Sequence, residues 1–191
     1  MDFHTLCIGC RTYRRFKRKQ IPEEILDELL ENARIANSAM NGQPLRYVLV
    51  KTLEAVRKIQ PCFHFAAALP KELGQPKEGE QPAAFIILCT EGPETPWTGI
   101  DIGIAVRTMN LNAYIHGVGS CIIGNVEFEK VKEILSIPET WIPRLALALG
   151  YPSHKSTIVE LPEDGSVKYY LDEERQYYVP KRKRKDISII R

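Results

Sequence analysis

The chain has 191 residues, 44% of them hydrophobic, and a formal net charge of +2 at pH 7. This length and composition predict a single domain, residues 1–191, with an apolar core of its own. The small net charge gives no support to nucleic-acid binding, and no apolar run reaches the roughly 18 residues that a membrane-spanning helix needs. Because the N-terminus has no apolar stretch before a small-residue cleavage site, we expect a cytoplasmic protein.

The first predicted elements are a short helix over residues 2–8 and a longer helix over about residues 23–36. Between them lies a basic segment, residues 10–17, with four cations and one hydroxyl, that of Thr12. Cations beside a small hydroxyl suit an anionic ligand, because guanidinium groups bind phosphate oxygens in two-point contacts. A solvated basic loop is the alternative interpretation.

A polar loop over residues 37–44 precedes a predicted strand, 46–51, and a helix, 53–60. Residues 61–82 have no regular period, and a segment of this kind is usually either functional, often as a lid, or disordered. Residues 83–90 are apolar on both alternations of a strand, which predicts a strand buried on both faces.

A long helix over about residues 98–116 is apolar around most of its circumference, which indicates burial in a core or an interface. The elements predicted after it are a strand, a helix and a strand, at residues 120–123, 129–135 and 145–149. The C-terminal part contains a turn at Asp164 and Gly165 and a basic run at 181–185. Alternation of helices and strands predicts three layers, α+β or α/β, with a mixed sheet.

The sequence offers little support for metal or hydrolytic chemistry. Cys7 and Cys10 have CxxC spacing, but a zinc site normally needs a second close pair, so we expect free thiols, with a redox or metal role as the alternative. The four histidines make no metal-ligand spacing, and the motifs of serine hydrolases, P-loops and dinucleotide-binding folds are missing.

Four separated segments share a pattern: Arg11–Phe16 with Ile21–Leu26, Ala36–Pro44, Gly99–Ala105 with Gly117–Gly124, and Ala148–Pro152. In order and spacing they resemble the FMN-dependent nitroreductase family. The resemblance implies an α+β fold with three α/β/α layers, a mixed, mostly antiparallel sheet and a domain-swapped C-terminal arm. It also implies a homodimer with FMN at the subunit interface.

The resemblance further implies which residues bind the flavin. Arg11, Thr12 and Arg14 are expected at its phosphate, ribityl chain and ring edge, and Ser38, Ala39 and Asn41 at the flavin of the other subunit. Ile123 and Gly124 are expected to offer backbone groups near the ring, and Lys181 and Arg182 to contact the phosphate. We assign Arg14 the stabilisation of the reduced flavin's negative charge. No catalytic side chain is expected, because the flavin carries the chemistry.

Three positions depart from the family pattern: Cys10 replaces a phosphate-binding arginine, Asn37 a proline and Leu45 a tryptophan. We hypothesise that Arg182, Arg184 and Lys185 compensate for Cys10. The implied activity is ping-pong transfer of reducing equivalents from NADH or NADPH to a nitroaromatic, quinone or other electron-poor acceptor. A flavin-binding protein with little turnover is the alternative, and a polyanion-binding module is a third hypothesis.

Overall fold

The computed structural model describes the backbone of residues 1–191 and every side chain except that of Lys71. Its main body is built on a four-stranded antiparallel sheet in the order β1-β2-β4-β3. The strands are Leu45–Val50 (β1), Ala84–Glu91 (β2), Gly119–Ile123 (β3) and Trp141–Gly150 (β4). The central strands β2 and β4 therefore have a neighbour on each side, and β3 is an edge strand.

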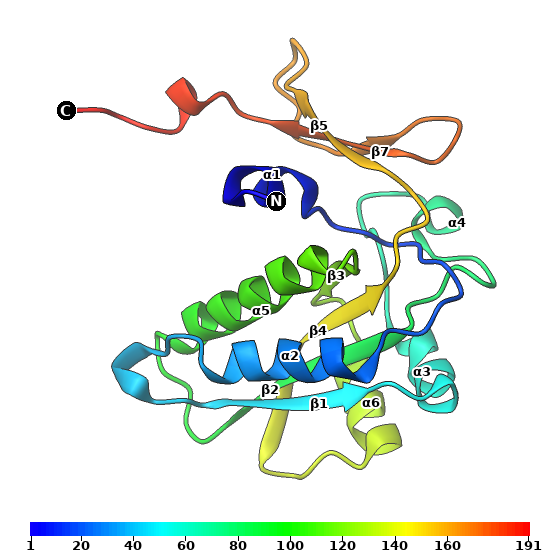
Figure 1. Ribbon diagram of the computed structural model, residues 1–191, viewed down its shortest axis with the longest axis vertical. Coiled ribbons are helices and arrows are strands. Elements are labelled where there is room, and N and C mark those ends of the chain that lie inside the picture. The colour runs from blue at the N-terminus through cyan, green and yellow to red at the C-terminus, as the bar shows by residue number, and fades with distance from the viewer.

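Two helices cover each face of this sheet (Figure 1). On one face lie α2 (Glu23–Arg34) and α5 (Thr98–Ile115), and on the other α3 (Leu53–Ile59) and α6 (Phe128–Leu135). Because side chains alternate along a strand, Ile86 of β2 packs beneath α2 and α5, whereas Ile87 packs against the other pair. The predicted α+β class with three layers and a mostly antiparallel sheet is confirmed.

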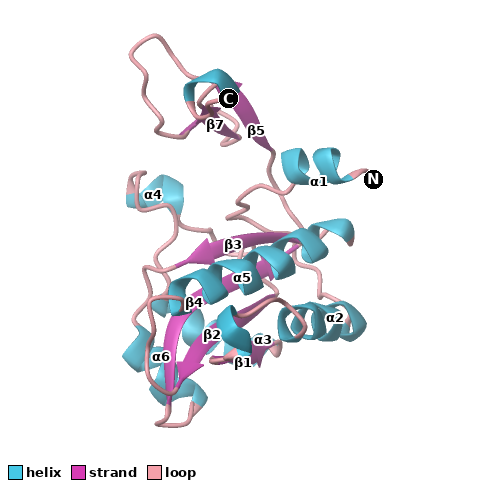
Figure 2. Cartoon of the chain, turned by 90° about the vertical axis from the view of Figure 1, so that its left-hand side faces the viewer, coloured by secondary structure: helices cyan, strands magenta, loops and turns pink.

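The C-terminal strands form a second, smaller sheet that we call the arm. It contains β5 (Ser156–Glu160), β6 (Tyr170–Leu171) and β7 (Tyr177–Lys181), in the order β5-β7-β6. The β5–β7 pair is parallel and the β6–β7 pair antiparallel. Figures 1 and 2 show the arm beyond the main sheet, with α1 (Phe3–Gly9) between it and α5. The strand at 177–181 was not predicted.

The remaining elements are single turns of helix. They are η1 (Ala39–Asn41), η2 (Gln60–Cys62), α4 (Lys71–Gly74) and η3 (Arg184–Asp186). Within the described chain, every helix falls short of the length or the apolar character that a bilayer crossing requires.

The irregular segment 61–82 is anchored to the body at both ends. Phe63 and Phe65 are buried, and the ring of Phe63 lies 4.4 Å from that of Phe85 in β2. Near the other end, the backbone carbonyl of Glu80 accepts a hydrogen bond of 2.9 Å from the N–H of Phe16. These aromatic residues are therefore core, and a role of the segment as a lid stays a prediction.

Strand β4 begins four residues before its predicted start, at a position where proline argues against a central strand. The register explains how Pro143 is accommodated: Leu88 pairs with Leu145 and Cys89 with Pro143, so Arg144 is the extra residue of a β-bulge. The bulge interrupts the ladder where proline has no N–H to donate.

The opening basic segment lies against the edge strand β3 and the end of β4, over two glycines that face each other in the sheet. Gly119 pairs with Gly150, and neither has a positive φ. A Cβ atom at Gly119 would lie 2.7 Å from the ring of Tyr13, and one at Gly150 would lie 2.8 Å from Phe16. Aromatic rings of the segment therefore rest directly on the backbone of the sheet.

Candidate functional site

The two ends of the chain meet at a cavity of about 220 Å³ between the opening segment, α5, β3 and the arm. Four of its lining residues are cations and none is a carboxylate. We call it the cationic cavity; its lining is Cys10, Arg11, Thr12, Arg14, Arg107, Asn110, Ser120, Ile122, Ser156, Tyr169, Val179 and Lys181. A cavity with this lining suits an anion.

The side chain of Arg14 extends from the opening segment to the arm. Its guanidinium carbon is 4.6 Å from the ring centre of Tyr169 and 4.9 Å from that of Tyr177, positions in which aromatic rings attract a cation. Its Nε is buried without a hydrogen-bond partner among the described residues, and so is Oγ of Ser156 in the same lining. A polar ligand in the cavity would satisfy such groups.

His154 fixes the backbone of Arg14. Its Nε2 accepts a hydrogen bond of 3.0 Å from the N–H of Arg14, so Nδ1 carries the proton and donates to the carbonyl of Lys155 at 2.9 Å. Burial, and then the positive charges of Arg15 and Arg14, lower the pKa of His154 to about 4. The imidazole is therefore a neutral acceptor at physiological pH.

Arg11 and Thr12 join α1 to the sheet. The guanidinium of Arg11 donates to the carbonyl of Cys7 at 3.0 Å and to that of Cys10 at 2.9 Å, which caps the C-terminus of α1. Thr12 bridges to Ser120 of β3 as a parallel neighbour. Arg11 therefore offers the cavity a charge with part of its hydrogen-bonding capacity already used.

Beneath these residues lies a polar network that was not predicted from the sequence. The thiol of Cys10 donates to Oδ1 of Asn110 at 3.0 Å, and Nη1 of Arg107 lies 3.5 Å from the same sulfur. Asn110 also bonds Arg107 and Ser120. Burial raises the pKa of the Cys10 thiol, an effect that Arg107 opposes, so the thiol is neutral and acts as a donor. A sequence signal did exist, since Asp101 and Arg107 are the two charged residues of α5.

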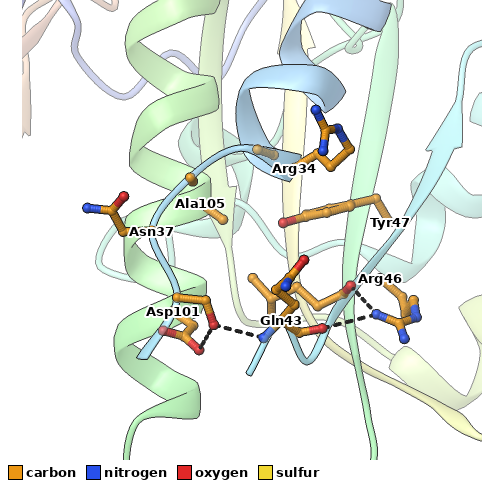
Figure 3. Close-up of a pocket in the computed structure, with 11 residues that line it drawn as sticks. Arg34, Asn37, Gln43, Arg46, Tyr47, Asp101 and Ala105 are labelled. Atoms are coloured by element: carbon orange, nitrogen blue, oxygen red, sulfur yellow. Dashed lines mark hydrogen bonds between the residues drawn. The ribbon is translucent and has the colours of Figure 1, made fainter. Parts of the chain in front are cut away.

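The loop after α2 forms a different pocket, of about 150 Å³. Ser38 Oγ donates to Oδ2 of Asp101 at 2.8 Å (Figure 3). The N–H of Ala39 donates to Oδ1 of the same carboxylate at 2.9 Å. Asp101 is six residues before Arg107 in α5, a rise of roughly 9 Å. Ser38 and Ala39 therefore do not line the cationic cavity of their own subunit.

The tip of this loop has an uncommon backbone. Met40, Asn41 and Gln43 have φ values of 53°, 55° and 47°, in the left-handed region that non-glycine residues rarely occupy. The side chain of Met40 is 96% exposed, and that of Asn41 is exposed as well. In Figure 3 the side chain of Asn37 also points away from the other labelled residues. The loop thus presents its tip outward.

The remaining predicted site residues divide between the cavity and its surroundings. Lys181 lines the cavity, whereas Arg182 is exposed and lies outside the lining. In β3 the lining residues are Ser120 and Ile122; Ile123 is buried in the core beneath α3 and α6, and Gly124 is exposed. The expected backbone contacts of Ile123 and Gly124 stay predictions, as does the phosphate contact of Arg182.

Comparisons with known proteins agree on one family. A model of the nitroreductase family matches residues 9–151. A putative NADH dehydrogenase/NAD(P)H nitroreductase of Methanothermobacter thermautotrophicus is 29% identical over 150 residues, which cover 75% of this chain and 73% of the relative. An FMN reductase [NAD(P)H] of Bacillus subtilis is 26% identical over 169 residues, 76% of this chain and 64% of the relative. A nitroreductase family protein of Streptococcus pneumoniae superimposes with a TM-score of 0.69 at 19% identity, covering 87% of this chain and 99% of its own.

Proposed function

Since the chain belongs to the nitroreductase family, we propose that it is an NAD(P)H-dependent FMN oxidoreductase that transfers reducing equivalents by a ping-pong mechanism to a nitroaromatic, a quinone or another electron-poor acceptor. The observation that carries the proposal is the cationic cavity, where both ends of the chain supply cations. The names of its relatives support the same chemistry, including an FMN reductase [NAD(P)H]. FMN, when bound, supplies the hydride chemistry, and the protein supplies position and electrostatics.

The residues present fit the charge of this cofactor. Arg11, Arg14 and Lys181 line one cavity, which matches a phosphate and a ring edge that gains negative charge on reduction. The unpartnered Nε of Arg14 and Oγ of Ser156 are buried polar groups that a ribityl chain or a phosphate would satisfy. His154 holds the backbone of Arg14 and two tyrosine rings flank its guanidinium, so its charge is fixed in place.

The cavity is small for the whole cofactor. Sites that enclose a cofactor-sized ligand usually have roughly 300–1,000 Å³, and this one has about 220 Å³. We therefore propose that the site is completed in a homodimer, in which Ser38, Ala39 and Asn41 reach the flavin of the other subunit. The exposed tip of this loop at Met40 and Asn41, with its uncommon backbone, supports this arrangement.

The dimer would bury an apolar stripe along α5. Trp97, Ile100, Ile104 and Ile115 are all exposed, at spacings that place them on one side of the helix. An exposed apolar stripe of this length on a helix packed against a sheet is typical of an interface between proteins. It also fits the sequence prediction of a helix that is apolar around most of its circumference.

Replacing Ile104 with glutamate is expected to convert the dimer to a monomer and to abolish flavin retention, because a carboxylate would be buried in the interface. Sedimentation velocity at several protein concentrations measures the first effect and the visible spectrum the second. Ile134→Glu is the matched control, since Ile134 is an exposed isoleucine of α6 on the other face of the sheet. An Ile104→Glu dimer with normal flavin content would contradict the proposed interface.

The activity itself is tested by the spectrum of the pure protein under anaerobic conditions. We expect a yellow protein whose flavin absorbance is lost on addition of NADH or NADPH and returns on addition of a quinone. Double-reciprocal plots at several acceptor concentrations should be parallel, as ping-pong kinetics require. A yellow protein that neither nucleotide bleaches would favour flavin binding without turnover, and a colourless protein that does not take up FMN would refute the proposal.

A further inference from the structure

Arg107 is a cation in an unexpected place. It is one of two charged residues in α5, and its side chain is only partly exposed. It lines the cationic cavity with Arg11, Arg14 and Lys181, which come from the ends of the chain. A role for Arg107 in the site was not predicted from the sequence.

The neighbour of Arg107 is the residue that departs from the family pattern. Cys10 is 2% exposed, and its thiol donates to both the side-chain and the main-chain oxygen of Asn110, at 3.0 and 3.3 Å. A buried neutral thiol with these partners cannot balance the charge of an anion. The position at which the resemblance leads us to expect an arginine is therefore uncharged.

The guanidinium of Arg107 occupies the space beside that thiol and is held there. Its Nη1 lies 3.5 Å from Sγ of Cys10 and donates to Oδ1 of Asn110, and Nδ2 of Asn110 donates to Ser120 of β3. Cys10 of the opening segment and Asn110 of α5 thus contact the guanidinium directly, and Ser120 of β3 holds Asn110. Among the described residues, Nε and Nη2 of Arg107 have no hydrogen-bond partner, although the side chain lines the cavity.

We propose that Arg107 binds the phosphate monoester of FMN in place of the arginine missing at position 10, and that Cys10 and Asn110 hold its guanidinium in position. This rests on the proposed function and assigns the phosphate to the part of the cavity next to α5. Arg11 is a weaker candidate for this contact, because Cys7 and Cys10 already accept its N–H groups. Arg184 and Lys185, which we hypothesised as compensating cations, are exposed in η3 and lie outside the lining.

The test compares two flavins that differ only in the phosphate. Dissociation constants for FMN and for riboflavin are measured by quenching of flavin fluorescence, with wild-type protein and Arg107→Gln. Glutamine keeps a hydrogen-bonding side chain and removes the charge. We expect the variant to bind FMN roughly ten- to a hundredfold more weakly, the range of one charge-assisted hydrogen bond, and to bind riboflavin within about threefold of wild type.

Two further variants separate a phosphate contact from a structural role. Arg107→Lys keeps the charge and should restore most of the FMN affinity. Arg57→Gln removes a cation of α3 that lines another cavity, and it should change neither dissociation constant. Wild-type FMN affinity should also fall with added salt, and less steeply in Arg107→Gln.

Each alternative result has a separate meaning. Equal loss of FMN and riboflavin binding in Arg107→Gln, or no loss of either, would overturn the role of Arg107 while leaving the flavoprotein proposal intact. Wild-type protein that binds riboflavin as tightly as FMN would also overturn it. Wild-type protein that binds neither flavin would refute the proposed function, and the role of Arg107 with it.

Discussion

Tyr177→Ala is expected to lower the free energy of unfolding by about 3–5 kcal/mol, the usual cost of truncating a fully buried aromatic side chain to alanine. Tyr177 is 1% exposed and begins β7, where its N–H donates to the carbonyl of Lys155 at 3.0 Å. Its ring lies 4.7 Å from that of His154 and 6.0 Å from that of Tyr169. The substitution therefore removes the side chain that joins the arm to the opening segment.

Flavin binding should fall together with stability in Tyr177→Ala, because Arg14 loses one of the two rings beside its guanidinium. Urea denaturation followed by circular dichroism measures the first effect and FMN titration the second. The matched control is Tyr170→Ala, whose exposed ring stacks on Tyr178 within the arm at 5.3 Å; we expect it to cost less than about 1 kcal/mol. Equal losses in the two variants would show that Tyr177 does not anchor the arm.

The second large effect is a loss of stability in acid that depends on His154. In the unfolded chain this side chain takes up a proton near its ordinary pKa of 6.5, whereas in the fold its pKa is about 4. The folded form therefore binds fewer protons between these values. The contribution of neutral His154 is fully present above pH 6.5 and is lost as the pH falls toward 4, by about 3 kcal/mol in total.

His154→Gln isolates this effect, because a glutamine carbonyl can accept the N–H of Arg14 but does not titrate. Unfolding free energies of both proteins are measured from pH 7.5 to pH 4. Carboxylates such as Glu80, on which Arg175 places two hydrogen bonds, contribute to both curves and cancel in the difference. If the two curves run parallel over this range, His154 is not the group responsible.

Most of the main body could be predicted because its signals are local. The apolar run of residues 83–90 predicts a strand buried on both faces, and in the structure β2 has a layer of helices on each side. The arm could not be predicted in the same way. Its strand β7 contains Pro180 and pairs in parallel with β5, whose residues lie 21 positions earlier, so neither local pattern nor a tight turn reveals the pairing.

The candidate site was predicted in part for a similar reason. Arg11, Thr12, Arg14 and Lys181 stand in basic stretches that are visible in the sequence, and the structure brings them to one cavity. Arg107 was missed because one cation inside an apolar helix looks like a solvent-facing residue. Only the tertiary structure, which places Cys10 3.5 Å from Arg107, shows what the two residues do together.

The facing glycines of β3 and β4 limit which substitutions this protein can accept in evolution. Alanine could adopt the backbone at either position, since neither φ is positive, and only space excludes it. A methyl group 2.7–2.8 Å from Tyr13 or Phe16 would have to lift the ring by roughly 1 Å to reach ordinary van der Waals separation. Thr12 and Arg14, the two neighbours of Tyr13 in the chain, would move with it. A homologue with alanine at either glycine would thus bind its cofactor differently, although every residue that contacts the cofactor is unchanged.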